Sequence, residues 1–223
     1  MGKRGPKPKN TIPTEWTPQL AYIVGLITSD GCLSKDGRHI DFTSKDIQLT
    51  KLFQKCLGIN HIKIGVKTAG SKETYSRIQF GNVIFYEWLI SIGLTPKKSK
   101  ILRSLQIPDT CFFDFVRGCF DGDGSIYSYW DKRWKSSFMF YIAIASGSLP
   151  FLLWLKKKIH QHIRIKGHIT KGTHDTFQLR YAKRESIVLF KKMFYSPNVP
   201  CLKRKHKKAL IIFKINDEEI IKK

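Results

Sequence analysis

Two segments of the chain share one pattern of apolar and polar positions. Residues 22–31 and residues 115–124 each predict an apolar helix that has a glycine near its middle and ends in Asp-Gly. When the two segments are aligned, their identical positions are 93 residues apart. The repeat predicts a chain built from two related halves. The identical pairs are Gly25 with Gly118, Asp30 with Asp123, and Gly31 with Gly124.

The glycines inside the two helices need a compensating contact, because each glycine costs a helix about 1 kcal/mol relative to alanine. Glycine lets two helix backbones approach closely. We therefore expect the two helices to pack on each other about a pseudo-twofold axis. Gly31 and Gly124 suit the position just beyond each helix, where glycine commonly adopts a left-handed conformation.

Asp30 and Asp123 would then lie together at the C-terminal ends of the paired helices. The helix dipole is negative at that end, so two carboxylates there would repel each other and the helix ends. A divalent cation with oxygen ligands would remove this conflict. A single Asp-Gly pair would more simply indicate a helix stop and a turn, but its duplication favours a metal site.

Alternating apolar and polar positions predict pairs of strands between the helices of each half. A hairpin is expected after each motif helix, with a turn at Asp36-Gly37 in the first half. Each half therefore predicts the order helix, two strands, helix, two strands, helix. A further helix with an apolar side follows in the second half. The clearest strands are residues 62–67 and 75–80, and then 163–168 and 177–181.

Each predicted sheet has one apolar face and one face of Lys, Arg, Tyr, Gln and His. In the first half, Ile62, Ile64 and Val66 are expected on the apolar face. The polar residue types are those that hydrogen-bond phosphates and base edges. A single hairpin of this kind would be an ordinary solvated surface, but the pattern recurs. The candidate DNA-binding residues are Arg38, Lys45, Lys63, Lys67, Tyr75, Arg77, Gln79, Lys166, His168, Gln178, Arg180 and Lys203.

The composition indicates a polyanionic partner. The 223 residues include 40 Lys and Arg but 17 Asp and Glu, which gives a formal net charge of +23. This charge exceeds what solubility requires and favours nucleic acid. There is no run of 18 apolar residues and no apolar leader, so we expect neither a membrane partner nor secretion. Five scattered cysteines fit a reducing, intracellular compartment, and their spacing predicts no zinc site.

The repeat divides the chain into three parts. Residues 1–13 are rich in Lys, Arg, Gly and Pro, and predict a flexible basic arm. This arm either follows a DNA backbone or remains a solvated tail. Residues 14–104 and residues 105–223 are the two repeats. The predicted fold class is α+β, with two pseudo-twofold-related αββαββα repeats that each carry an antiparallel sheet and pack through the motif helices.

Both motif segments resemble the signature helices of the LAGLIDADG homing endonucleases, in the single-chain form that carries two copies. Residues 25–31 and residues 115–124 carry this resemblance. It implies saddle-shaped sheets that lie along the major groove of double-stranded DNA. It also implies a monomer whose unlike halves bind a long, asymmetric target. The implied activity is metal-dependent hydrolysis of both strands, which leaves short 3′ overhangs.

The same resemblance implies the metal ligands. Asp30 and Asp123 match the acidic residues that bind the catalytic metal. Ser29 and Gly122 directly precede the two aspartates. Whether the backbone carbonyl of either residue also binds the metal stays open. Mg²⁺ is the expected ion, Mn²⁺ is expected to substitute for it, and Ca²⁺ is expected to support binding without cleavage.

The resemblance further implies a lysine near the active site in each half. Lys98 is the candidate in the first half, and Lys205 or Lys203 is the candidate in the second. A phosphate contact or plain surface charge is an equally good interpretation of each lysine.

Two other functions fit the same fold. One is an intron RNA maturase, and the other is a DNA-binding regulator that does not cleave. An aspartate in both motifs favours cleavage over the regulator, but a maturase could keep both. Asp121 aligns with Thr28 and not with an acidic residue, so we expect it to be structural.

Overall fold

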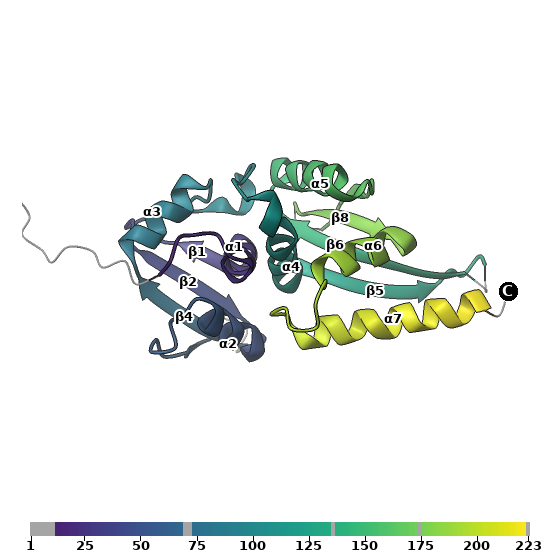
Figure 1. Cartoon of the computed structure of the whole chain (residues 1–223), viewed down its shortest axis with the longest axis horizontal. Helices are drawn as coiled ribbons and strands as arrows, with labels where there is room; N and C mark the ends of the chain where they lie inside the picture. The colour runs from purple at the N-terminus through teal and green to yellow at the C-terminus, as the bar shows by residue number, and fades with distance from the viewer. Residues whose placement is uncertain (1–11, 69–72, 135–136, 174, 222–223) are drawn as a thin grey trace, which may run out of the picture.

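A computed structural model describes residues 12–68, 73–134, 137–173 and 175–221, so most of the predicted basic arm lies outside the described residues. The chain forms two halves that stand side by side, and α1 and α4 meet at the centre (Figure 1). The first half has the predicted order αββαββα. Its elements are α1 (Pro18–Asp30), β1 (Gly31–Leu33), β2 (His39–Ser44), α2 (Ile47–Cys56), β3 (Gly65–Thr68), β4 (Thr74–Gly81) and α3 (Val83–Ser91).

The second half repeats this order and adds one long helix. Two short 3₁₀ turns, η1 (Lys98–Lys100) and η2 (Asp109–Cys111), lie between the halves. The added helix runs along the second sheet and ends far from the centre (Figure 1). The elements are α4 (Phe112–Asp123), β5 (Gly124–Trp130), β6 (Phe138–Ser146), α5 (Leu149–Ile163), β7 (His168–Lys171), β8 (Phe177–Ala182), α6 (Lys183–Met193) and α7 (Lys203–Ile221).

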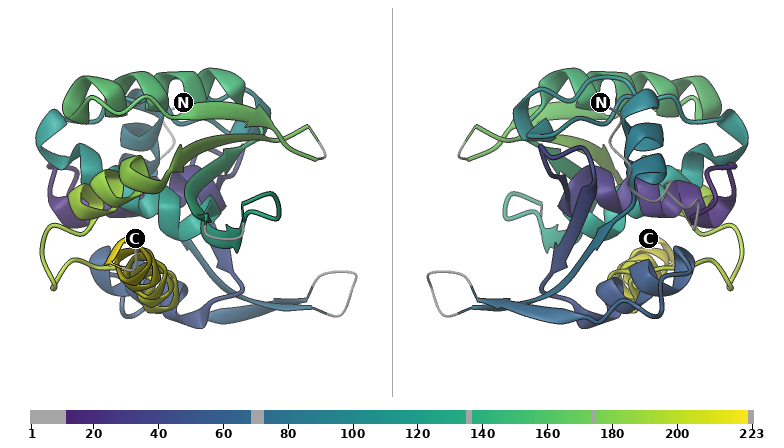
Figure 2. Two further views of the ribbon diagram at one scale, coloured as in Figure 1. Left: turned by 90° about the vertical axis from the view of Figure 1, so that its right-hand side faces the viewer. Right: turned by 90° about the vertical axis from the view of Figure 1, so that its left-hand side faces the viewer.

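Each half carries a four-stranded antiparallel sheet, and the two sheets have equivalent strand orders. The orders are β1-β2-β4-β3 and β5-β6-β8-β7. Helices pack on one face of each sheet, and the strands of both sheets extend away from them towards the same side of the molecule (Figure 2). We call the face without helices the open face. The predicted α+β fold of two repeated units is confirmed. None of the described helices is both long and apolar enough to cross a membrane.

Local sequence signals set the ends of the motif helices. Thr17 caps α1, because its Oγ1 accepts a hydrogen bond from the backbone N–H of Leu20 at 3.1 Å, and Pro18 follows at the first helical position. Gly31 lies just beyond the helix, as expected, in an extended and not a left-handed conformation (φ −84°). Glycine is required there by space, since a β-carbon would lie 2.6 Å from the α-carbon of Ile27.

Two predicted strands differ from the structure. The predicted strand 163–168 begins only at its last residue, His168: Ile163 ends α5, and Arg164 takes a left-handed conformation (φ 59°) that terminates the helix. The apolar positions there belong to the last helical turn and to a buried connection, which also alternate. Strand 62–67 begins only at Gly65, and Val66 is 76% exposed, because β3 is the edge strand and extends past the helices.

Candidate functional site

α1 and α4 pack against each other in parallel, and their backbones touch where the two glycines meet. A β-carbon on Gly25 would lie 2.8 Å from the α-carbon of Gly118, and one on Gly118 would lie 2.9 Å from that of Gly25. Any other residue at either position would force the helices apart. The contact is nearly the same in both directions, as a pseudo-twofold axis requires.

Asp30 and Asp123 are the last residues of α1 and α4, so both carboxylates lie at the junction of the halves. A β-carbon on Gly122 would lie 2.9 Å from Oδ2 of Asp30. Burial, and after it repulsion by Asp123, raises the pKa of Asp30 to about 7. Burial also raises the pKa of Asp123, while Lys98 and Lys205 oppose both shifts. We call these two carboxylates the acidic centre.

The residue before each aspartate differs between the halves. It is Ser29 in the first half and its counterpart Gly122 in the second. The Ser29 hydroxyl donates to the backbone carbonyls of Gly25 and Leu26 at 3.2 and 3.1 Å, which keeps this side chain against its own helix. It faces Gly122, where a β-carbon would lie 1.9 Å from Oγ of Ser29. Serine thus fits in the first half because glycine stands opposite it in the second.

Two buried lysines, one from each half, approach the ends of the motif helices. Lys98, in η1, donates a hydrogen bond to the backbone carbonyl of Gly31. Burial lowers the pKa of both amines, that of Lys205 to about 8. Lys205, in α7, satisfies most of the free carbonyls at the end of α4. Its Nζ lies 2.6–2.8 Å from the carbonyl oxygens of Phe120, Asp121, Gly122 and Gly124, which share the three N–H donors of the ammonium group.

Two small cavities lie beside Asp123. One of about 70 Å³ is lined by Asp123, by Lys98 of the first half and by Ser146 of the second. The other, of about 300 Å³, is lined by Asp123 with Arg204 and Lys205. Lys98 is also influenced more strongly by Asp123 than by the carboxylate of its own half, both of which act to raise its pKa. Lys98 therefore reaches across the interface towards the opposite carboxylate.

Asp121 connects the motif helices to the segment before α7. Its buried Oδ2 accepts hydrogen bonds from the hydroxyl of Tyr22 at 2.8 Å and from the backbone N–H of Leu202 at 2.7 Å. Burial raises the pKa of Asp121 to about 6, although both hydrogen bonds oppose the shift. These contacts agree with the structural role expected for Asp121, because they hold the start of the helix that carries Lys205.

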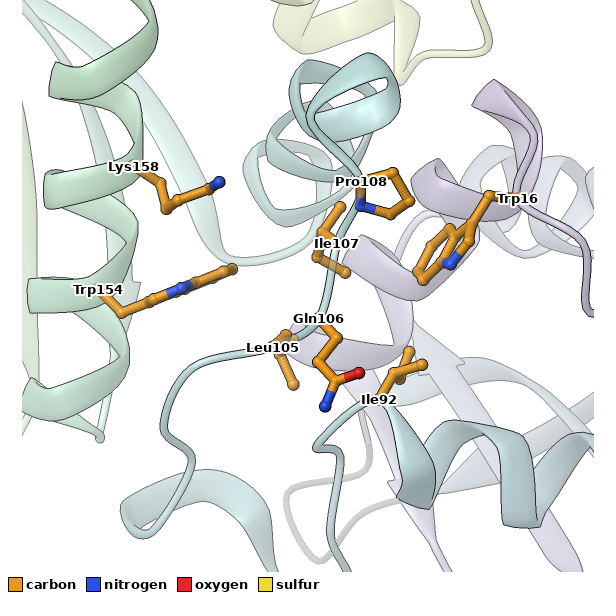
Figure 3. A pocket seen from close by; sticks show the side chains of 8 residues that line it. All are labelled: Trp16, Ile92, Leu105, Gln106, Ile107, Pro108, Trp154 and Lys158. Carbon is orange, nitrogen blue, oxygen red and sulfur yellow. The ribbon is translucent and has the colours of Figure 1, made fainter.

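A larger cavity of about 400 Å³ lies at the opposite end of the motif helices (Figure 3). Trp16 and Pro108, which precede α1 and α4, line one side of it, and Trp154 and Lys158 of α5 line the other. The 13 residues of α1 separate it from the acidic centre by roughly 20 Å. This cavity is therefore not part of the acidic centre.

The sheets bring only some of the predicted DNA-binding residues together. Four lie on the open face of the first sheet, and three lie on that of the second. The other five lie beside the sheets, in loops or at the start of α7, and Lys45 is paired with Glu73 at 2.7 Å. On the open faces are Lys67, Tyr75, Arg77 and Gln79, and then His168, Gln178 and Arg180. Beside the sheets are Arg38, Lys45, Lys63, Lys166 and Lys203.

An aromatic cluster that was not predicted from the sequence lies on the open face of the second sheet. Tyr141 stacks with Tyr127 at 5.5 Å and with Tyr129 at 6.3 Å between ring centroids. The guanidinium of Arg180 lies 5.3 Å from the ring of Tyr127 and 4.9 Å from that of Tyr141. The alternation of tyrosines in β5 was a usable signal. Asp41, which pairs with Arg77 on the first sheet, was also missed.

The acidic centre fits a divalent cation. It offers two hard oxygen ligands whose charges are disfavoured by burial and by each other, and a cation would relieve both effects. Within the described residues, no group of three or more His, Cys, Asp or Glu could enclose a metal. Mg²⁺ suits such an open site, because it commonly takes one or two carboxylates and completes its shell with water and substrate phosphate.

The backbone carbonyls beside the two carboxylates are not equally placed to add a metal ligand. The carbonyl of Gly122 already accepts a hydrogen bond from Nζ of Lys205 at 2.8 Å. That bond weakens the case for this carbonyl as a ligand, because the ammonium group occupies a lone pair and repels a cation. Whether the carbonyl of Ser29 binds the metal stays open.

Comparisons with known proteins identify the fold. No protein-family model and no curated protein matches the sequence. Among solved structures, full-length DUF199/WhiA from Thermatoga maritima matches with a TM-score of 0.58 and 16% identity, over 92% of this chain and 63% of that one. The LAGLIDADG homing endonuclease I-LtrWI bound to target DNA matches with a TM-score of 0.57 and 13% identity, over 92% and 95% of the two chains. This chain has the LAGLIDADG fold.

A third neighbour extends this result. The I-DmoI complex with DNA and Mn matches with a TM-score of 0.52 and 16% identity, over 80% of this chain and 97% of that one. Identities this low show the LAGLIDADG fold alone. This chain also spans less than two thirds of full-length WhiA. The resemblance noted in the sequence is therefore confirmed for the fold, while homing endonuclease activity stays a prediction.

Proposed function

We propose that this chain is a site-specific double-strand DNA endonuclease in which residues 14–104 and 105–223 each contribute one motif helix and one sheet. The observation that carries the proposal is the acidic centre, where Asp30 and Asp123 end two touching helices beside Lys98 and Lys205. Packing alone does not require carboxylates at this junction, since burial raises the pKa of both.

In this proposal the two carboxylates and the two nearby lysines have different roles. Asp30 and Asp123 would hold divalent metal, which when bound supplies Lewis-acid stabilisation of the charge that develops on a phosphate. Lys98 places a buried positive charge beside the two carboxylates, where it stabilises negative charge in the transition state. Lys205 acts on Asp123 indirectly, because it fixes the carbonyls at the end of α4. Lys205 is therefore a positioning residue.

The substrate of the proposed enzyme is a long, asymmetric DNA duplex. The net charge of +23 provides non-specific attraction to phosphates, and the open faces of the two sheets provide base contacts. The neighbouring I-LtrWI structure contains target DNA, and I-DmoI structures contain DNA with Mn, Ca or Mg. By analogy, Mg²⁺ or Mn²⁺ supports cleavage, Ca²⁺ supports binding, and one chain acts as a monomer. Two closely spaced cuts across one minor groove would leave short 3′ overhangs.

A cleavage selection on a randomised duplex library tests the proposal. Wild-type protein is incubated with Mg²⁺, and parallel reactions contain Ca²⁺ or the Asp30→Asn or Asp123→Asn variant. We expect one enriched site of about twenty base pairs that only the wild type cuts on both strands, and only with Mg²⁺ or Mn²⁺. Normal double-strand cleavage by either variant would refute the metal assignment.

A second candidate function is nucleic-acid binding without cleavage, as a regulator or as a maturase. The observation that favours it is the basic surface, because the net charge of +23 and the polar open faces of both sheets can bind nucleic acid whether or not the acidic centre holds a metal. Tight binding of duplex DNA without any cut in every metal would support a regulator. Stimulation of RNA splicing without duplex cleavage would support a maturase.

A further inference from the structure

Strand pairing gives a residue-by-residue correspondence between the two open faces. Gly31, which follows the first motif aspartate, is aligned through β2 with Ile78 of β4. Gly124, which follows the second, is aligned through β6 with Leu179 of β8. Ile78 and Leu179 are thus equivalent positions, and both are fully buried against the helices. Their neighbours, which point to the open faces, are Arg77 and Gln79 in β4 and Gln178 and Arg180 in β8.

The two halves therefore carry the same two residue types in exchanged order. Strand β1 leads away from the acidic centre, and its far end is aligned with Phe80. The position of Gln79 and Arg180 is consequently the outer one, and the position of Arg77 and Gln178 is the inner one. An arginine stands at the inner position of the first half and at the outer position of the second half.

Both arginines are held in a fixed orientation, but by different groups. Asp41 binds the Nε and Nη2 groups of Arg77 through one carboxylate oxygen. Arg180 has no carboxylate partner among the described residues, and it lies over the rings of Tyr127 and Tyr141 instead. Its buried Nε has no hydrogen-bond partner there. A guanidinium held against aromatic rings keeps its remaining donors free for a ligand.

We propose that the two halves read base pairs related by the pseudo-twofold axis, with exchanged specificity. Arginine donates two hydrogen bonds to O6 and N7 of guanine, and glutamine forms a bidentate pair with N6 and N7 of adenine in the major groove. At the outer position Arg180 selects a G·C pair and Gln79 selects an A·T pair. At the inner position Arg77 selects G·C and Gln178 selects A·T. The inference rests on the proposed function, because the open faces must lie in the major groove of DNA.

The competing role for Arg180 is a phosphate contact, which would add affinity without sequence preference. The two roles predict different behaviour on substitution. Loss of a base contact changes the preferred base at one position, whereas loss of a phosphate contact weakens all duplexes alike and flattens the salt dependence. Arg180→Gln separates them, because glutamine removes the charge that a phosphate contact uses but offers adenine a two-pronged base contact in place of guanine.

The test is a binding selection from a randomised duplex library in Ca²⁺, with wild-type protein and the variants Arg180→Gln and Gln79→Arg. We expect Arg180→Gln to change one G·C preference to A·T, and Gln79→Arg to change an A·T preference to G·C at the position related to it by the pseudo-twofold axis. On defined duplexes each exchange should alter discrimination by about 10- to 100-fold. Lys171→Gln is the matched control, since it removes a charge from β7 at a residue that alternates away from the open face.

Each outcome of this selection decides a different question. If the wild type enriches a site but both variants retain its base preferences, the exchanged specificity is wrong and the proposed DNA binding stands. If Arg180→Gln weakens every duplex equally and changes no base preference, Arg180 contacts phosphate and the inference fails. If the wild type enriches no duplex, the proposed function itself fails.

Discussion

Gly25 and Gly118 lie in backbone contact at the crossing of α1 and α4, where a β-carbon on Gly25 would be 2.8 Å from the α-carbon of Gly118. This contact fixes how the two halves are arranged, because it brings the C-terminal ends of the same helices together. The positions of Asp30 and Asp123 relative to each other depend on it. A change at the glycines should therefore alter both stability and the acidic centre.

Gly25→Ala and Gly118→Ala should each lower the free energy of unfolding by about 1–3 kcal/mol, since the new methyl group meets backbone that cannot yield. Urea denaturation measures the change. Gly65→Ala is the control, because a β-carbon there would have only the carbonyl oxygen of Arg77 nearby, at 3.8 Å. The control should change stability by about 0.5 kcal/mol or less. Equal effects at Gly25 and Gly65 would contradict the close helix contact.

Asp30→Asn should stabilise the metal-free protein while it abolishes cleavage. The folded-state pKa of Asp30 is raised to about 7, so this group contributes stability below its unfolded pKa of about 4, and that contribution is lost as pH rises towards 7. In a chelating buffer, the advantage of the variant should grow from pH 4 to pH 7 and then stay constant, at an order of a few kcal/mol. Chemical denaturation at several pH values measures it. A variant less stable than wild type at pH 8 would show that burial and repulsion by Asp123 do not destabilise the charged form of Asp30.

Lys205→Met should destabilise the protein more than Lys98→Met. Lys205 donates to four carbonyls at the end of α4, whereas Lys98 donates to one carbonyl after α1. Unsatisfied buried carbonyls should lower the free energy of unfolding by about 1–3 kcal/mol in Lys205→Met. Lys98→Met should stay closer to wild-type stability and lose double-strand cleavage.

Nicked-plasmid assays with strand-labelled target would separate the two lysines further. Because Lys98 lines the cavity that contains Asp123, its loss should slow one strand more than the other. Equal slowing of both strands by Lys98→Met would show that the lysine serves the whole centre and not one carboxylate. Melting temperature reports the structural effect of Lys205→Met independently of cleavage.

The motif helices could be predicted because their signals are local and duplicated. The glycine, aspartate and glycine of each copy lie within seven residues, so the repeat was visible without knowledge of the fold. Thr17 and Pro18 likewise specify the start of α1 through a local hydrogen bond. The strand predicted at 163–168 began too early because two residues, Ile163 and Ile165, fit a helix end and a loop as well as they fit a strand.

The contacts that complete the site are long-range, and no local pattern encodes them. Tyr22 binds Asp121 across 99 positions of the sequence, and Lys205 reaches the end of α4 across 81 to 85 positions. The sequence indicated Asp30 and Asp123 from their context, but it suggested Lys98 and Lys205 only through resemblance. Their burial and hydrogen bonds depend on how the two halves pack.

Arg117→Met should be among the most damaging single substitutions, although Arg117 does not belong to the acidic centre. Its fully buried guanidinium pairs with Asp114 at 2.6 Å and donates to the carbonyls of Met193 and Pro200 at 2.7 and 3.0 Å. Removing it leaves a buried carboxylate without its cation, which costs about 3–5 kcal/mol. It also frees the segment that leads to α7 and Lys205, so cleavage should fall with stability.

Adding Asp114→Asn to Arg117→Met should recover part of the lost stability, because the second substitution removes the uncompensated charge. Arg133→Met is the matched surface control. Arg133 pairs with Asp131 at 3.0 Å but its side chain is 82% exposed, so its loss should leave the free energy of unfolding close to that of the wild type. Urea denaturation of the four proteins gives the comparison. If the double variant is no more stable than Arg117→Met, the cost comes from lost packing around Tyr22 and not from the unpaired charge.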